Sequence, residues 1–265
     1  MPGGLLFAGV DVGSLSTDIV LVSEEGEIAG QAVVATGASI ARAYAEAMKA
    51  ALASAGAIAA EIAFTVSTGY GRERVPGSDL SLTEIGCHAR GARHLFPEAV
   101  TVLDIGGQDS KVIRIGPNGK VSDFAMNDKC AAGTGRFLEV MARTLEVDLE
   151  QMGERALQAT RPLAVSSMCT VFAESEVVSL IASGASPGDI AWGIHTAIAE
   201  RIAALADRVG VAQPVVMTGG VAKNRAARKA IEERLRVRLL VPDEPQVAGA
   251  LGAALFARER RRAPH

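Results

Sequence analysis

The segment D-V-G-S-L-S-T-D-I-V-L-V, residues 11–22, and the segment D-I-G-G-Q-D-S-K-V-I-R-I, residues 104–115, align with each other residue for residue. An apolar stretch precedes each copy, and a glycine-containing turn with another strand-like run follows it. A strand, an Asp-x-Gly turn and a returning strand that occur twice in one chain predict two similar lobes.

The two repeated turns have the residue types of a phosphate-binding site. Glycine lets backbone N–H groups approach phosphate oxygens, and an aspartate can hold Mg²⁺ through water or orient an attacking water. Asp11 and Asp104 are therefore candidates for Mg²⁺ binding and water positioning, and Gln108 is a candidate for orienting a water. One glycine turn alone is a weak signal, because such turns more often serve only geometry. The residues expected to contact nucleotide phosphates are Gly13, Ser14, Leu15, Ser16, Gly106, Gly107 and Lys111.

A third glycine turn, T-G-G-V-A-K-N at residues 218–224, opens a helical run that extends to about Leu235. Glycine backbone beside a helix start suits the adenosine end of a nucleotide. The residues expected to border the nucleotide here are Gly219, Gly220, Val221, Asn224 and, further along the chain, Gln246.

Strand and helix patterns alternate along the chain and predict an α/β fold. Two lobes are expected at residues 1–95 and 96–246, with a small-residue helix at about 247–265 packing back on the first lobe. Strands are expected at Leu5–Val10, Ile19–Val22, Ile28–Val34, Ile62–Ser67, Ala99–Leu103 and Pro214–Met217, and helices at about 38–54 and 83–94.

Two cysteine motifs lie between the second repeat and the third glycine turn. M-N-D-K-C-A-A-G-T-G-R-F, residues 126–137, and S-S-M-C-T-V-F-A-E-S-E, residues 166–176, each place a cysteine at the start of a run with helical apolar spacing. Unpaired backbone N–H groups at a helix start favour a thiolate at Cys130 and Cys169, which can be a nucleophile, a redox thiol or a metal ligand. The other candidates in these motifs are Gly133 and Gly135 for nucleotide contact, and Glu174 for polarising the attacking water or, equally, for a surface or capping role.

The composition limits the classes of partner and location. A chain of 265 residues, 49% of them hydrophobic, is long enough for two lobes. The net charge of −3 gives no indication of a nucleic-acid partner, and no apolar run is long enough to cross a membrane. Three cysteines without a secretion signal argue against a disulfide framework and favour the cytoplasm. No ligand spacing connects the four histidines, His88, His94, His195 and His265.

The order of D-x-G-S, D-I-G-G-Q-D, T-G-G-V and G-A-L-G-A-A resembles the ATPase superfamily of actin, Hsp70 chaperones and sugar kinases, which has a ribonuclease H-like fold. With the two cysteine motifs, the whole chain is similar to the activators of 2-hydroxyacyl-CoA dehydratases in the BadF/BadG/BcrA/BcrD ATPase family. The ATP-binding subunits of benzoyl-CoA reductase are close relatives. The resemblance implies two duplicated α/β lobes around a nucleotide cleft.

The resemblance also implies a homodimer that holds one [4Fe–4S] cluster and binds ATP or ADP with Mg²⁺ in each subunit. ATP hydrolysis would drive one low-potential electron from a ferredoxin or flavodoxin to a partner dehydratase. We expect the nucleotide state to set the angle between the lobes and to shift the helical segments 131–143 and 170–183. Many relatives carry a lysine where Asp18 stands, so either Lys111 of the second repeat supplies that charge or the first turn binds phosphate through its backbone alone.

A count of thiols favours the dimer. A cubane cluster takes four thiolates, and the chain has three cysteines. Cys87 lies within a predicted helix and is expected to be a buried small hydrophobe. Two chains that each supply Cys130 and Cys169 provide four ligands around a two-fold axis. The residues alone leave open helix capping by both cysteines and a tetrahedral Zn²⁺ across the same axis, and the resemblance favours iron and sulfur.

Three other functions remain open at this point. The first is the ATP-binding subunit of a benzoyl-CoA reductase-type enzyme, although the compact length favours a separate dehydratase activator. The second is a small-molecule kinase of the same fold, acting on an amino sugar, for which Asp109 is the candidate catalytic carboxylate. The third is a nucleotide-switched scaffold, which would need neither cysteine.

Overall fold

The computed structural model describes residues 4–161, 163–165 and 169–262, and it divides into two compact units. As far as these residues are described, unit 1 comprises Met1–Val102, Ile115–Ser122 and Pro242–His265, and unit 2 comprises Leu103–Arg114 and Asp123–Val241. Residues 166–168 of the second cysteine motif and 263–265 of the expected C-terminal helix lie outside the described residues.

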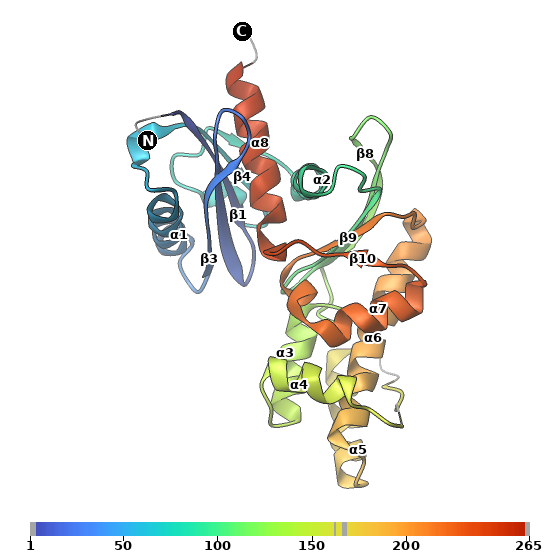
Figure 1. Cartoon of the computed structure of the whole chain (residues 1–265). Coiled ribbons are helices and arrows are strands. Elements are labelled where there is room, and N and C mark those ends of the chain that lie inside the picture. Colours follow the sequence, from blue (N-terminus) through green and yellow to red (C-terminus); the bar gives the residue numbers. More distant parts are fainter. Residues whose placement is uncertain (1–3, 162, 166–168, 263–265) are drawn as a thin grey trace. The chain divides into compact units, whose positions relative to one another are not determined.

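The sheet of unit 1 contains five strands in the order β3-β2-β1-β4-β5 (Figure 1). β1 is antiparallel to β2 and parallel to β4, and its register places Asp11 opposite Asp18. β1 is buried along its whole length, which explains its nearly continuous apolar sequence. The strand bounds are β1 Leu6–Val12, β2 Ser16–Val22, β3 Ile28–Ala35, β4 Ile62–Thr68 and β5 Leu80–Ser81.

Two helices cover opposite faces of this sheet. Leu6, Ala8 and Val10 share a hydrophobic cluster with α1, whereas Phe7 shares one with α8. This alternation follows from the two-residue period of a strand. Gly9 faces α8, where a Cβ atom would lie 1.9 Å from the carbonyl oxygen of Ala250, so the helix backbone lies directly on β1. The helices of unit 1 are α1 Ile40–Ala55, α2 Glu84–Leu95 and α8 Ala248–Arg262, and its 3₁₀ turns are η1 Ala59–Glu61, η2 Arg72–Arg74 and η4 Pro245–Val247.

α8 also contacts α2 closely at Gly252, and we expect a side chain at this position to destabilise the protein. A Cβ atom at Gly252 would lie 1.8 Å from the carbonyl oxygen of Cys87. Gly252→Ala is therefore expected to lower the free energy of unfolding by about 1–3 kcal/mol, because the backbone must move to relieve the overlap. Gly86→Ala is the matched control, since its Cβ would have no neighbour closer than 4.0 Å. Urea unfolding of both variants tests this, and equal stability of the two would contradict it.

The second sheet contains five strands in the order β10-β9-β6-β7-β8. Its central strand β6 is fully buried and ends in Asp104 and Ile105. The strand bounds are β6 Thr101–Ile105, β7 Ser110–Ile115, β8 Val121–Asn127, β9 Val215–Thr218 and β10 Leu239–Leu240.

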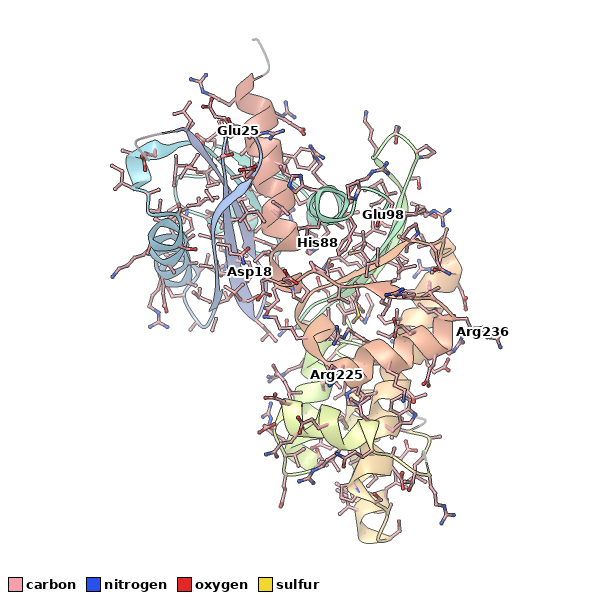
Figure 2. The ribbon with its side chains drawn as sticks, in the orientation of Figure 1. Asp18, Glu25, His88, Glu98, Arg225 and Arg236 are labelled. Carbon is pink, nitrogen blue, oxygen red and sulfur yellow. The ribbon has the colours of Figure 1, made fainter. Side chains whose placement is uncertain are left out.

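The helices of unit 2 share one large hydrophobic cluster with its strands. Within this unit, α5 lies at the end away from β9 and β10 (Figure 1). The side chains of Arg225 and Arg236 mark the two ends of α7 (Figure 2). The bounds are α3 Gly135–Thr144, α4 Leu149–Leu157, α5 Thr170–Ala182, α6 Pro187–Val209, η3 Gly220–Lys223 and α7 Arg225–Leu235.

The predicted strands and helices are confirmed to within a few residues, with one error at the first cysteine motif. The helix there begins at Gly135 after an N-cap at Thr134, so Cys130 lies in the preceding loop and not at a helix start. Cys169 is the N-cap residue of α5, as predicted. No helix among residues 4–161, 163–165 and 169–262 has the length and apolarity that a bilayer crossing requires.

Candidate functional site

The first repeated turn closes through its backbone. Gly13 N donates to the carbonyl oxygen of Ser16 at 2.9 Å, and Thr36 Oγ1 donates to the carbonyl oxygen of Gly13 at 2.9 Å. Ser16 Oγ donates to Asp18 Oδ2 at 3.1 Å and lies 3.5 Å from Nε2 of Gln246. Gln246, predicted as a nucleotide contact, is thus brought to this turn. Ser14 and Leu15 lie at the tip, where Ser14 is half-buried and Leu15 is exposed.

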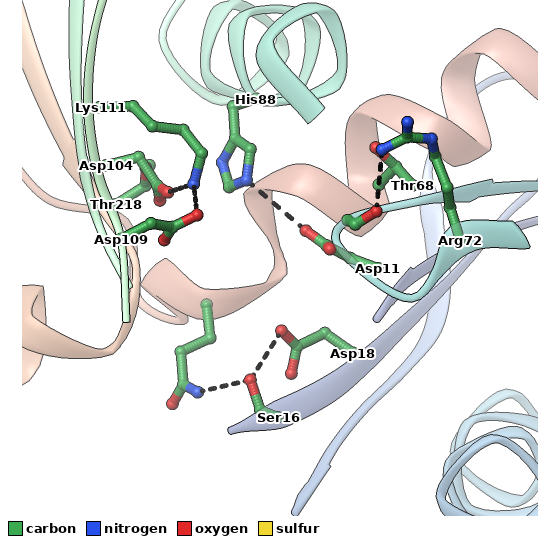
Figure 3. A network of polar contacts seen from close by, with 12 residues as sticks. Asp11, Ser16, Asp18, Thr68, Arg72, His88, Asp104, Asp109, Lys111 and Thr218 are labelled. Atoms are coloured by element: carbon green, nitrogen blue, oxygen red, sulfur yellow. Dashed lines mark hydrogen bonds and ion pairs between the residues drawn. The ribbon is translucent and has the colours of Figure 1, made fainter. Parts of the chain in front are cut away.

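Asp11 lies at the end of β1 with its carboxylate enclosed by unit 1 (Figure 3). Nε2 of His88, on α2, lies 3.5 Å from Oδ2 of Asp11, within ion-pair distance. The prediction named Asp11 but assigned nothing to His88. Nothing in the spacing of the four histidines could have identified it, because the contact depends on how α2 packs in the fold.

The second repeated turn has the same backbone closure and a different charge arrangement. Gly106 N donates to the carbonyl oxygen of Asp109 at 3.0 Å, as Gly13 does to Ser16. Lys111 Nζ donates to Asp104 Oδ2 at 3.2 Å and to Asp109 Oδ2 at 2.7 Å (Figure 3). Asp104 and Lys111 are each only 2% exposed. The repeat therefore places a buried ammonium between two carboxylates, which compensates the cost of burying the charges.

Thr218, at the end of β9, completes the surroundings of Asp104. Its Oγ1 donates to Asp104 Oδ1 at 2.8 Å, so each oxygen of this carboxylate accepts a hydrogen bond. Sequence reasoning placed Thr218 in the third glycine turn but gave it no role. No spacing in the sequence indicates this contact, because it depends on β9 lying beside β6 in the sheet.

α3 begins directly on the second turn. Gly135 N donates to the carbonyl oxygen of Gly106 at 2.9 Å, and Arg136 N donates to that of Gly107 at 2.8 Å. The first turn of a helix leaves such N–H groups without partners inside the helix. Here they bond the second repeated turn, so Gly135 helps to fix the shape of the loop at Gly106 and Gly107. Gln108, at its tip, is exposed.

The third glycine turn requires glycine at its first position. Gly219 has φ +83, and a Cβ atom there would lie 2.4 Å from the carbonyl oxygen of Ile105, so a side chain is excluded. Gly220 and Val221 follow in η3, where Val221 is buried. The turn is therefore held flat against the end of β6.

Asn224 has a structural role that the sequence did not indicate. Its Oδ1 accepts hydrogen bonds from the backbone N–H groups of Ala226 and Ala227, both at 3.0 Å, and caps α7. Its Nδ2 donates to Nε2 of His195 at 3.0 Å, and Nδ1 of His195 donates to the carbonyl oxygen of Ala191 at 2.7 Å. Because this imidazole is fully buried, its pKa is lowered below 6.5.

Protonation of His195 is expected to destabilise the protein in acid. The unfolded chain takes up a proton near pH 6.5, whereas the folded imidazole stays neutral to lower pH. The contribution of the neutral imidazole to the free energy of unfolding is fully present above about pH 6.5. It is lost as the pH falls from there through the lowered pKa of the folded state. Urea unfolding of wild type and His195→Gln from about pH 7.5 to 4.5 measures it. His94→Gln is the control on a more exposed histidine, and an equal pH slope in wild type and His195→Gln would contradict the prediction.

Cys130 lies in a loop that is fixed by hydrogen bonds. Asn127 Nδ2 donates to the carbonyl oxygens of Cys130 at 2.7 Å and Ala132 at 3.3 Å. Gly133 has φ +84, and a Cβ atom there would lie 2.8 Å from Cβ of Arg201. Gly133 thus has a geometric reason to be glycine. The Cys130 thiol is half-buried.

Cys169 and the helix that it caps are on the surface of unit 2. The thiol is exposed, and the helix α5 buries only Ala173 and Val177 among its described side chains. Four large apolar side chains of α5 are exposed, by 43% or more of their surface. They are Val171, Phe172, Val178 and Ile181, and we refer to them as the α5 apolar face.

Two candidates remain, Cys87 and Glu174, together with the question of a metal site within one chain. Cys87 is fully buried, as predicted, and burial raises the pKa of its thiol to about 12. Glu174 is exposed on α5, where Thr144 Oγ1 donates to its Oε1 at 3.5 Å. Among the residues that the structure describes, no three His, Cys, Asp or Glu side chains gather as a metal site within the chain.

Relatives with this sequence pattern include dehydratase activators. The activator of lactoyl-CoA dehydratase of Anaerotignum propionicum is 47% identical over 251 residues, which cover 95% of this chain and 96% of the relative. A benzoyl-CoA reductase subunit of Thauera aromatica is 38% identical over 220 residues, which cover 80% of this chain and 77% of the relative.

Solved structures show the same fold. Component A of the Acidaminococcus fermentans (R)-2-hydroxyglutaryl-CoA dehydratase has a TM-score of 0.94 at 44% identity and covers 98% of this chain and 100% of its own. The activator of the 2-hydroxyisocaproyl-CoA dehydratase from Clostridium difficile was solved with bound ADPNP. It has a TM-score of 0.91 at 39% identity, and the match covers 98% of this chain and 99% of that activator.

A sugar kinase shares the fold at much lower identity. A ROK family glucokinase from Streptomyces griseus has a TM-score of 0.57 at 17% identity and covers 96% of this chain and 99% of its own. The predicted actin, Hsp70 and sugar-kinase-like fold is thereby confirmed. Residues 8–257 match one family, and together with the relatives this shows that the chain belongs to the BadF/BadG/BcrA/BcrD ATPase family.

Proposed function

We propose that this protein is an ATP-dependent activator of a 2-hydroxyacyl-CoA dehydratase, in which ATP hydrolysis drives one low-potential electron from a ferredoxin or flavodoxin to the dehydratase. The observation that carries this proposal is the pair of free thiols that are not fully buried, Cys130 in the loop before α3 and Cys169 at the N-cap of α5, the helix with the exposed α5 apolar face. The relatives named as activators of lactoyl-CoA and 2-hydroxyisocaproyl-CoA dehydratases support the class of partner.

ATP hydrolysis is assigned to the repeated turns. Asp11 and Asp104 would hold Mg²⁺ through water and position the attacking water, and Gln108 at the exposed tip would orient that water. The Lys111 ammonium, 3.2 Å from Asp104, supplies positive charge at the second turn. The backbone of Gly13–Ser16 and Gly106–Gly107 would bind phosphate. The third turn with Gly219, Gly220 and Val221 would border the adenosine, and Asn224 would act there only through its cap on α7.

The thiols of the chain fit a shared iron–sulfur cluster in their chemistry. Cys87 is excluded by burial and its raised pKa, which leaves two usable thiols per chain, and a cubane takes four. Cys130 and Cys169 of each of two chains would hold one [4Fe–4S] cluster, which when bound supplies a one-electron carrier of low potential. Cys169 at the N-cap of α5 would place a helix N-terminus beside the anionic group.

The α5 apolar face supports the homodimer that this cluster requires. Four large apolar side chains exposed on one helix indicate an interaction site, and a two-fold contact places the same surface on both partners. The thiol of Cys169 begins the same helix. A two-fold contact at α5 would bury these apolar side chains and bring the two Cys169 thiols to one axis, where Cys130 of each chain would complete the set of four ligands.

Observations disfavour two of the alternatives. The amino sugar kinase rests on a fold likeness at 17% identity, which shows the fold alone. A benzoyl-CoA reductase-type subunit is supported by a relative at 38% identity, below the 47% of the dehydratase activator. A structural Zn²⁺ would satisfy the same four thiolates, and metal analysis separates it from iron.

An anaerobic assay tests the proposed function. The protein is mixed with reduced ferredoxin, MgATP, a 2-hydroxyacyl-CoA and the (R)-2-hydroxyglutaryl-CoA dehydratase, and formation of the unsaturated acyl-CoA is followed. We expect product only with MgATP and none with ADPNP in its place. Phosphorylation of an amino sugar without dehydratase activation would contradict the proposal.

A further inference from the structure

The carboxylate of Asp11 is enclosed from two sides by glycines. A Cβ atom at Gly69 would lie 2.3 Å from its Oδ1, and a Cβ atom at Gly249 would lie 2.0 Å from its Oδ2. Only residues without side chains leave room for the carboxylate at these positions. Its Oδ2 faces Nε2 of His88 at 3.5 Å, and the two side chains are 10% and 7% exposed (Figure 3).

The two repeats differ in what faces their aspartates. Across the second hairpin, Asp104 meets the ammonium of Lys111, and Thr218 donates to its other oxygen. Across the first hairpin, the register partner of Asp11 is Asp18. A second carboxylate cannot donate a hydrogen bond to Asp11 when ionised, and like charges opposite each other on a sheet repel.

The packing of α2 on α8 places His88 in front of Asp11. Its neighbour Cys87 presents a carbonyl oxygen to Gly252, where a Cβ atom would lie 1.8 Å away. One turn further along α2, a Cβ atom at Gly91 would lie 1.9 Å from the carbonyl oxygen of Ala248. These two backbone contacts hold α2 against α8 on either side of His88, whose place on α2 is seen in Figure 2.

We propose that His88 is a positioning residue for Asp11 and takes the role in the first repeat that Lys111 and Thr218 have in the second. The imidazole presents Nε2–H to Oδ2 and fixes the rotation of the carboxylate toward the magnesium-bound or attacking water. This inference rests on the proposed ATPase function for the role of Asp11. A distance of 3.5 Å before the nucleotide binds fits such a role, because catalytic hydrogen bonds often shorten only in the loaded site.

A variant without the donor tests this proposal. His88→Leu is expected to lower kcat for ATP hydrolysis by about tenfold or more and to raise the Mg²⁺ concentration needed for half-maximal rate, because partners that orient a ligand typically contribute 10–100-fold. The KM for ATP is expected to change little, since phosphate and adenosine contacts remain. His88→Gln, which keeps an N–H donor, is expected to recover most of the rate. His94→Leu, on an exposed position of the same helix, is the matched control.

A second-site variant separates positioning from a folding defect. Asp18→Lys in the His88→Leu background places an ammonium opposite Asp11 in the arrangement of Lys111 and Asp104, and it is expected to restore part of kcat. Unchanged kcat and Mg²⁺ dependence in His88→Leu would overturn the inference while leaving the proposed function standing. A loss of rate that neither His88→Gln nor Asp18→Lys restores would also overturn it. A wild-type protein that does not hydrolyse ATP would overturn the proposed function, and the inference with it.

Discussion

Replacing Asp104 with asparagine is expected to lower the rate of ATP hydrolysis by about 10²–10⁴-fold, the range found when a group that handles the reacting water is lost. The amide has nearly the same shape as the carboxylate, but only its one oxygen accepts. With that oxygen toward Lys111 Nζ, now 3.2 Å from Oδ2, the NH2 group faces Thr218 Oγ1, now 2.8 Å from Oδ1, and can donate to this hydroxyl. It lacks the charge that would hold Mg²⁺ through water. A steady-state phosphate-release assay measures the effect.

Asp109→Asn is the matched control for Asp104. This residue also accepts from Lys111, at 2.7 Å, but its side chain is 28% exposed and the ATPase account gives it no chemical role. We expect Asp109→Asn to retain most of the ATPase rate. The opposite order, with Asp109→Asn inactive and Asp104→Asn active, would contradict the assignment and favour the kinase alternative.

Replacing Lys111 with methionine is expected to lower the free energy of unfolding by about 3–5 kcal/mol, the cost typical of removing one partner from a buried ion pair. Methionine fills a similar volume, so the penalty arises from the carboxylate of Asp104, whose side chain is 3% exposed and which loses the ammonium beside it. Denaturant unfolding, followed by circular dichroism, measures the change.

Lys49→Met is the control for the loss of a lysine on the surface. Lys49 is exposed on α1, and substitutions of this kind usually change stability by less than about 0.5 kcal/mol. A Lys111→Met variant as stable as Lys49→Met would show that the buried carboxylates do not need the ammonium. The double variant Lys111→Met with Asp104→Asn is expected to recover part of the loss, because it removes the buried negative charge.

The repeat made much of the fold predictable. Two copies of an Asp-x-Gly turn, at residues 11–13 and 104–106, were expected to give similar hairpins, and both turns close by the same backbone hydrogen bond from the glycine. The apolar run Leu5–Val10 was likewise expected to be a strand, and in the fold Leu6, Ala8 and Val10 join one hydrophobic cluster while Phe7 joins another. These features depend on residues that are close in sequence.

The contacts that complete the candidate site come from distant segments. His88 reaches Asp11 from α2, and Thr218 reaches Asp104 from β9, 114 residues away. A residue type without a spacing pattern gives no indication of such a contact. Asn224 shows the reverse case, because its position in a glycine turn indicated a nucleotide contact while its side chain is used to cap α7 and to bond His195.

The cysteine motifs were predictable only in part. Helical spacing of apolar residues identified the helices. The loop around Cys130, however, is held by the hydrogen bond from Asn127 Nδ2, and α3 begins only at Gly135. On α5 the same spacing could not show that Val171 and Phe172 are exposed, since one chain does not say what covers a helix. That exposure is the structural feature on which the proposed two-fold contact rests.

The most direct test of the account is an iron and acid-labile sulfide analysis of anaerobically purified protein, combined with its native mass. We expect a dimer with about four iron and four sulfide per two chains, and a monomeric, iron-free protein when both Cys130 and Cys169 are replaced by serine. A wild-type protein that is monomeric and free of iron, or a cluster that remains after both substitutions, would contradict it.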